Sequence, residues 1–170
     1  MGGRGASSSM SKSMTGAIKE SVLLEKSEDW YYENLTQDEK KAVVDYTIYN
    51  YTNNPNDAEE IKHLQSALGK FELEDDIVAY RGVNSTEFAN TMFSFNGQTD
   101  FKSTSLNKAQ AEKFAENQGG YIIEYHIKKG NRGAYLEGVP MSKEKEYLIN
   151  KGQNFKVLKQ DGKTLVVEVG

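Results

Sequence analysis

The chain has 170 residues, which is close to the usual length of a single domain. It contains no cysteine, and this excludes a disulfide scaffold, a thiolate zinc site and a cysteine nucleophile. With only two histidines, far apart in the sequence, we expect no metal site. The net charge of −4, without any lysine or arginine block, argues against binding of nucleic acid. No apolar run approaches the roughly 18 residues of a membrane span, so we expect no membrane segment.

The first 20 residues differ in composition from the rest of the chain. Gly, Ser and Lys dominate them, so they offer almost nothing to bury. We therefore predict a flexible leader over residues 1–20 and one folded domain over residues 21–170.

Two helices are predicted in the first half of the chain. The run Thr36-Gln37-Asp38-Glu39 has the spacing of a capping box, and apolar residues then recur at helical spacing until Asn53-Asn54-Pro55 ends the helix. A second box over Asn56–Glu59 predicts another helix, for which Gly69 is the expected end. Trp30–Tyr32 indicate a short helix or turn before Thr36.

From Asp76 onward, short β-branched or aromatic runs bounded by Gly, Asn and Asp predict strands. Two helical pieces, near Ser85–Met92 and Asn107–Glu116, interrupt them. A helical first half followed mostly by strands predicts an α+β fold with largely antiparallel sheets, and no Gly-rich nucleotide-binding motif contradicts this. The expected strands are Ile77–Val83, Phe101–Leu106, Tyr121–Ile127, Ala134–Glu137, Glu146–Ile149, Phe155–Leu158 and Leu165–Val169.

Arg81 stands out among the charged residues because it ends the first predicted strand. It lies on the same strand face as Ile77 and Ala79. A guanidinium on an apolar face needs a partner, and two remain open: a structural ion pair, or a phosphate held by the bidentate fork.

Two further motifs place polar side chains on predicted strands. In Phe101–Leu106, Ser103 and Ser105 share one strand face, and hydroxyls inside a sheet need hydrogen-bond partners. In Glu144-Lys145-Glu146 the two carboxylates share a face at the start of a strand. This pair is either a solvated strand end or the electrostatic partner of a developing cation, as paired carboxylates are in glycoside cleavage.

The order of these motifs resembles the signature of the Arg–Ser–Glu ADP-ribosyltransferases: an arginine on a first strand, aromatic-x-Ser-Thr-Ser on a second and Glu-x-Glu opening a later one. The chain is similar to the enzymatic domains of the actin-modifying binary toxins and their phage and bacterial relatives, from about Trp30 to the C-terminus. Three further segments extend the likeness, namely Asn34-Leu35-Thr36 leading into Asp45-Tyr46-Thr47, Gly133-Ala134-Tyr135-Leu136, and Ser142–Glu146.

The resemblance implies two packed, roughly perpendicular and mostly antiparallel β-sheets with an N-terminal helical layer. It implies a transferase that moves ADP-ribose from NAD, its co-substrate, to a protein side chain and releases nicotinamide. Members with Glu-x-Glu generally modify arginine, so the acceptor would be an arginine-bearing host or target protein, with actin as one candidate. We expect the protein to be a monomer. Because the sequence shows no secretory signal, we expect it to act in the cytoplasm of the producing cell or to be delivered as an effector or phage component.

The resemblance also assigns roles within the site. Glu146 would stabilise the ribosyl cation, and Glu144 would orient the acceptor guanidinium and take its proton. Met141 would help to recognise the acceptor. Binding of NAD would involve Arg81 at the pyrophosphate, Phe114 against the nicotinamide, Tyr51 in the nucleotide cleft, Thr104, Ser103 as a hydrogen-bond partner of Glu146, Glu146 itself, and Tyr46 if it lines the cleft rather than the core.

Three positions depart from the relatives' pattern. Close relatives often carry arginines where Gly82 and Asn117 stand, so NAD binding would be weaker or arranged differently. Arginine-modifying toxins commonly have an aromatic residue at the position of Met141, which leaves acceptor recognition open. Two other functions also stay open: an NAD glycohydrolase that uses water at the same site, and a non-catalytic binding module that retains the fold.

Overall fold

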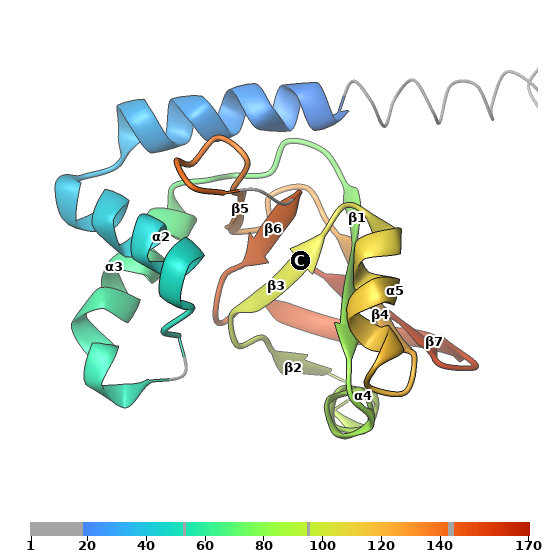
Figure 1. The fold of residues 1–170 in the computed structure, drawn as a ribbon. Helices are drawn as coiled ribbons and strands as arrows, with labels where there is room; N and C mark the ends of the chain where they lie inside the picture. Colours follow the sequence, from blue (N-terminus) through green and yellow to red (C-terminus); the bar gives the residue numbers. More distant parts are fainter. Residues whose placement is uncertain (1–18, 53, 95, 143–144) are drawn as a thin grey trace, which may run out of the picture.

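The computed structural model describes residues 19–52, 54–94, 96–142 and 145–170 (Figure 1). A helix over residues 19–29 runs into the π-helical turn η1 (Trp30–Asn34). No helix within the described ranges is long and apolar enough to cross a membrane. The elements that follow are α2 (Gln37–Tyr49), the 3-10 turn η2 (Pro55–Asp57), α3 (Ala58–Gly69), β1 (Ile77–Val83), α4 (Ser85–Phe93), β2 (Asn96–Gln98), β3 (Lys102–Ser105), α5 (Lys108–Glu116), β4 (Tyr121–Ile127), β5 (Gly133–Tyr135), β6 (Glu146–Ile149), β7 (Asn154–Asp161) and β8 (Thr164–Val169).

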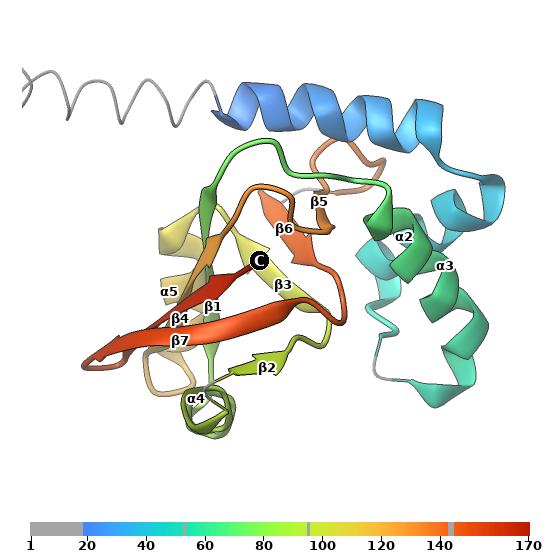
Figure 2. The same ribbon diagram turned by 180° about the vertical axis from the view of Figure 1, so that it is seen from behind.

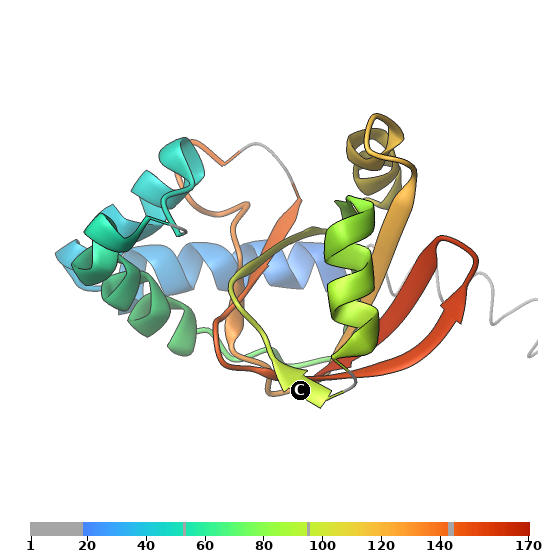
Figure 3. The same cartoon turned by 90° about the horizontal axis from the view of Figure 1, so that it is seen from below.

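The N-terminal helices form a layer of their own. The predicted capping box starts α2: Thr36 Oγ1 accepts from the Glu39 amide at 3.2 Å, and Glu39 Oε1 accepts from the Thr36 amide at 2.8 Å. Trp30 is 2% exposed, and its indole N–H donates to the Ala67 carbonyl of α3 at 2.8 Å. Figures 1 and 3 show α2 and α3 at one end of the molecule, beyond β5 and β6, and β7 toward the other end.

Eight strands form one mixed sheet in the order β2-β7-β8-β4-β1-β3-β6-β5. Neighbouring strands are antiparallel except β4 and β8, which run parallel. The α+β class and the mostly antiparallel pairing are confirmed, but the two expected sheets are the two halves of one continuous ladder. Within the described strands, β1 and β3 are joined by a single registered pair, Tyr80 and Ser105. Because this junction is so short, β3 and β6 turn away from the direction of β1 and β4, as Figures 1 and 2 show.

Local differences from the sequence prediction lie mainly in the N-terminal half. The helix over residues 19–29 is missed because its buried face, Leu23, Ser27 and Trp30, has a serine in the middle of the apolar pattern. The predicted leader boundary at residue 20 therefore falls inside a helix. The second capping box does not form, since Asp57 precedes α3 without a side-chain cap and Asn54 caps η2 instead. The short strand β2 is also missed.

Candidate active site

Glu146 is the first residue of β6 and lies opposite Ser105 of β3. Its carboxylate oxygen Oε2 accepts two hydrogen bonds, from the Ser103 hydroxyl at 2.8 Å and from the Tyr46 hydroxyl at 2.9 Å. The first is the contact expected from the sequence, and the second comes from α2, 100 residues away. Two donors from two different elements orient this carboxylate before any substrate binds.

Tyr46 is a permanent donor in this arrangement. It is 5% exposed, and burial, followed by the charge of Glu146 and the hydrogen bond to it, raises the pKa of the phenol well above its ordinary value. The phenol therefore stays protonated at physiological pH. The sequence leaves open whether Tyr46 lines the cleft or belongs to the core. In the structure its ring is buried in the helical layer and its hydroxyl reaches the site.

Arg81 of β1 makes a two-pronged ion pair with Glu87 of α4. Its Nε donates to Glu87 Oε2 at 2.7 Å and its Nη2 to Oε1 at 3.0 Å, while Nη1 donates to the Ser103 carbonyl at 3.2 Å. Burial raises the pKa of Glu87, but the hydrogen bond and charge of Arg81 outweigh this, and the pKa ends below its ordinary value. A guanidinium has about five N–H groups. The three contacts above leave the remaining N–H groups of Arg81 for an anion.

Arg81, Ser103 and Glu146 open onto a cleft of about 950 Å³ between α5 and the strands β1 and β3. Ligand pockets typically measure roughly 300–1,000 Å³, so this one has room for a sizeable ligand. Phe114 of α5 is 65% exposed in its wall, which leaves its ring available to a planar group. The lining is completed by Gly82, Thr104, Ser105, Asn107, Ala109, Gln110, Ala111, Lys113, Asn117 and Gln118.

Gly82 is required by the close approach of α5 to β1. A Cβ at this position would overlap the Ala111 carbonyl and lie 2.9 Å from the Ala115 amide nitrogen. Both obstacles are backbone atoms, so no side chain fits unless α5 moves. The second arginine that the resemblance leads one to expect at this position would therefore not fit beside Arg81.

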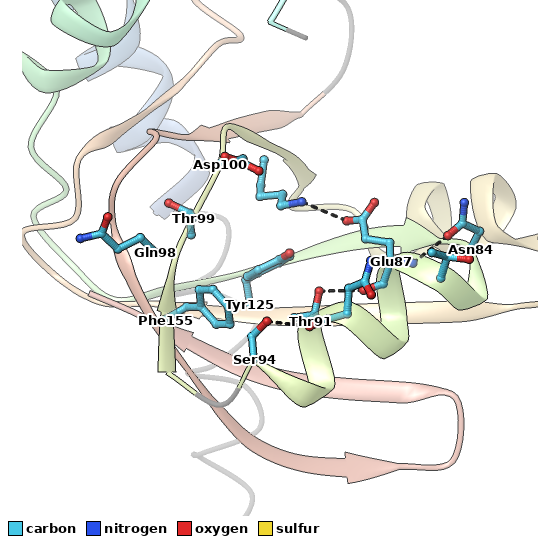
Figure 4. A pocket seen from close by; sticks show the side chains of 12 residues that line it. Asn84, Glu87, Thr91, Ser94, Gln98, Thr99, Asp100, Tyr125 and Phe155 are labelled. Carbon is cyan, nitrogen blue, oxygen red and sulfur yellow. Dashed lines mark hydrogen bonds and ion pairs between the residues drawn. The ribbon is translucent and has the colours of Figure 1, made fainter.

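A second hollow, of about 400 Å³, is lined by Glu87 (Figure 4). Because Arg81 lines the cleft and is paired with Glu87, the ion pair lies between the two hollows. Lys102 reaches Glu87 Oε2 there at 3.4 Å. Figure 4 shows the rings of Tyr125 and Phe155 close together, with Glu87 on α4 across from them. Two hollows with a guanidinium between them suit an elongated ligand that carries negative charge in its middle. The other lining residues are polar: Asn84, Thr86, Asn90, Thr91, Ser94, Gln98, Thr99 and Asp100.

Two residues predicted to bind the nucleotide have their hydroxyls engaged elsewhere. Thr104 lines the cleft, but its hydroxyl donates to the Tyr147 carbonyl at 2.6 Å. Tyr51 is buried between α2 and α3, and its hydroxyl donates to the Ala42 carbonyl at 2.8 Å. The structure therefore does not bring Tyr51 to the cleft.

The residues predicted to meet the acceptor belong to the segment between β5 and β6. Met141 is 64% exposed, and its φ of 74° lies in the left-handed region that non-glycine residues seldom adopt. Its side chain is therefore accessible to a second molecule. Glu144 lies outside the described residues, so its placement stays a prediction.

Glu87 is a site residue that the sequence analysis misses. The Asn84 side chain accepts from the Glu87 amide at 2.8 Å and so caps α4. The spacing Asn84-x-x-Glu87 is a helix-start signal directly after the strand that ends near Arg81. It could have placed Glu87 in the first helical turn, close to the guanidinium.

Known proteins share both this sequence and this fold. The chain is 32% identical over 157 residues to the NAD(+)–arginine ADP-ribosyltransferase EFV of Enterococcus faecalis, covering 81% of this chain but 32%, about a third, of that protein. Its fold is similar to that of Plx2a, an ADP-ribosyltransferase toxin from Paenibacillus larvae, with a TM-score of 0.68, 19% identity and coverage of 92% and 96% of the two chains. It is also similar to BECa, the ADP-ribosylating toxin of a binary enterotoxin of C. perfringens with NADH, with a TM-score of 0.66, 22% identity and coverage of 90% and 47%. Residues 24–168 match the family model for the ADP-ribosyltransferase exoenzymes, and the chain belongs to this family.

Proposed function

We propose that this protein transfers ADP-ribose from NAD to an arginine side chain of a protein acceptor and releases nicotinamide. The observation that carries the proposal is the Glu146 carboxylate, oriented by Ser103 and Tyr46 in a ligand-sized cleft that also contains Arg81. The likeness to EFV, whose name states this activity, supports arginine as the acceptor.

NAD is a long molecule with an anionic pyrophosphate in its middle, which matches the two hollows on either side of the Arg81–Glu87 pair. The nicotinamide half would occupy the larger cleft, against Phe114 and near Glu146. The adenosine half would occupy the smaller hollow, where the half-buried ring of Phe155 offers aromatic surface. The free N–H groups of Arg81 would bind the pyrophosphate, while Glu87 holds the guanidinium in place from the other edge.

The chemical step breaks the bond between the ribose and nicotinamide, and the electron pair of that bond leaves with the nicotinamide nitrogen. The ribose becomes an oxocarbenium ion. Glu146 stabilises this cation through space and by a hydrogen bond to a ribose hydroxyl. Because Ser103 and Tyr46 already hold the carboxylate, little reorganisation is needed when the charge develops.

The acceptor guanidinium then attacks the ribose carbon and loses a proton. Glu144 would orient the guanidinium and take that proton as the new carbon–nitrogen bond forms. Met141, which is exposed, would contact the apolar stem of the acceptor arginine. Water attacking the same carbon would give NAD hydrolysis in place of transfer.

Purified protein incubated with NAD and agmatine, a small arginine analogue, tests the proposal. We expect nicotinamide to be released and ADP-ribosylagmatine to accumulate, with the new bond on the guanidine as determined by mass spectrometry. In a lysate, the same method should locate ADP-ribose on arginine residues. Nicotinamide release without any modified acceptor would instead indicate an NAD glycohydrolase, and failure to bind NAD would indicate a non-catalytic module.

A further inference from the structure

The segment between β5 and β6 is fastened to the N-terminal helix (residues 19–29) at two points. Ser27 is fully buried, and its hydroxyl donates to the Tyr135 carbonyl and accepts from the Gly138 amide at 3.0 Å. At the other end of the segment, Lys145 Nζ donates to Glu20 Oε2 at 2.9 Å. Figures 1 and 2 show the helix, in blue, passing over this part of the chain, in orange.

Both fastening points lie on one face of the helix. Glu20 and Ser27 are two turns apart, about 10 Å along the helix axis. Leu23, which lies between them on that face, is buried. A helix is rigid over this length, so it fixes the separation between its contacts at Gly138 and at Lys145.

The contact at Gly138 is too close to admit any other residue. A Cβ there would lie 2.5 Å from the Glu28 amide nitrogen and 2.7 Å from Ser27 Oγ. The approach of the helix, and not an unusual backbone angle, therefore requires glycine at this position. The helix and the segment are therefore joined by the hydrogen bond between Ser27 and Gly138 and by close packing around Gly138.

Glu146 is anchored by a different set of contacts. Its carboxylate is held by Ser103 of β3 and Tyr46 of α2, neither of which takes part in the contact between helix and segment. The carboxylate that acts on NAD and the segment that carries Met141 thus have separate supports. The backbone of Glu146 does meet the segment, because its carbonyl accepts from the Leu136 amide at 2.9 Å. The two hydroxyls that donate to its carboxylate come from outside the segment.

We infer that the N-terminal helix is a positioning element for the acceptor: through Ser27 and Glu20 it sets the place of the segment that carries Met141, and it affects transfer much more than NAD cleavage. The inference rests on the proposed arginine transfer. Small errors in the placement of a reacting group lower rates strongly. Here such an error falls mainly on the attacking guanidinium, because the donors to the Glu146 carboxylate lie outside the segment. Transfer and NAD hydrolysis therefore respond differently to changes at Ser27.

Two substitutions test this, with one matched control. Ser27→Ala removes the bridging hydroxyl, and Gly138→Ala forces the segment away from the helix. In each, we expect kcat/KM for agmatine to fall about tenfold, while nicotinamide release without acceptor stays within about twofold of the wild type. Gly69→Ala, where an added Cβ meets nothing within 4 Å, should change neither rate. Thermal unfolding of every variant verifies that it is folded.

An exposed residue provides a variant that does not disturb the core. Glu20→Lys reverses the charge that faces Lys145, and the Glu20 side chain is 41% exposed. Transfer to agmatine should fall at low salt, and the deficit should shrink as salt screens the charges. Glu25→Lys makes the same change at an exposed position of the same helix and should leave transfer unaltered.

The wild type is measured first, because nicotinamide release without any ADP-ribosylagmatine contradicts the proposed function itself. If the wild type transfers, the variants decide the inference. Parallel losses of transfer and hydrolysis in Ser27→Ala would overturn it, as would unchanged transfer in Gly138→Ala and Glu20→Lys. If Ser27→Ala fails to fold, the comparison of Glu20→Lys with Glu25→Lys decides alone.

Discussion

Replacing Tyr46 by phenylalanine removes one of the two hydroxyls that donate to Glu146 Oε2 and leaves the buried ring in place. A hydrogen bond to a charged group contributes roughly 1.5–3 kcal/mol. Each 1.36 kcal/mol lost from transition-state stabilisation lowers the rate about tenfold. Since Ser103 still donates to the same oxygen at 2.8 Å, we expect a loss at the lower end, about tenfold in nicotinamide release.

The second donor sharpens this prediction. Ser103→Ala should cost a similar factor, because it removes the other hydroxyl from the same oxygen. In the double variant no hydroxyl from Tyr46 or Ser103 orients the Glu146 carboxylate. The rate of nicotinamide release by the double variant should therefore fall by more than the product of the two single factors.

Tyr51→Phe is the matched control for Tyr46→Phe. It too removes a buried phenol hydroxyl from the helical layer, but that hydroxyl donates to the Ala42 carbonyl, away from the cleft. The assay is nicotinamide release at saturating NAD without acceptor, with thermal unfolding measured in parallel. Tyr51→Phe should lose stability only. Equal rates for Tyr46→Phe and the wild type, or equal losses in both tyrosine variants, would refute the role assigned to Tyr46.

Three further predictions concern other parts of the molecule. Arg81→Lys keeps the charge but loses the fork, so calorimetry should show weaker NAD binding; unchanged affinity would leave Arg81 with the structural role alone. Glu144→Gln should suppress agmatine modification and spare nicotinamide release, and a loss of both to the level of Glu146→Gln would disprove the division of labour. Burial raises the pKa of Glu39, but hydrogen bonds from Lys70, Thr36 and Ser66 outweigh this and lower it from 4.5 to about 2. Glu39 therefore stabilises the fold fully above pH 4.5, and this contribution disappears as the pH falls toward 2. Unfolding of Glu39→Gln should lack that part of the acid dependence, and an unchanged acid dependence would contradict it.

Much of the fold follows from local patterns in the sequence. The strands β1, β4 and β6 coincide with their predicted ranges because each is a β-branched or aromatic run with clear boundaries. The Thr36 box is a contact within one turn, which the sequence encodes directly. By contrast, the continuity of the sheet depends on the pairing of Tyr80 with Ser105, and local sequence does not determine a pairing between distant strands.

The candidate site also combines features that local sequence indicates with features that depend on distant contacts. Arg81, Ser103 and Glu146 are recognisable in the sequence, and the register of β3 with β1 and β6 brings them together. The hydrogen bond from Tyr46 to Glu146 joins residues 100 positions apart and depends on how α2 packs against the sheet. The resemblance predicts that Tyr51 lines the nucleotide cleft, but the turn of the chain after α2 directs its hydroxyl to the Ala42 carbonyl.

Glu146→Gln tests the central claim most directly, because it keeps the shape of the side chain and removes the charge that faces the ribosyl cation. Both nicotinamide release and agmatine modification should fall by about 100-fold or more, on the scale of removing a preorganised electrostatic group. Thermal unfolding should show that the variant is folded. If the folded variant retained both activities within a few-fold of the wild type, Glu146 would not be the carboxylate on which this account depends.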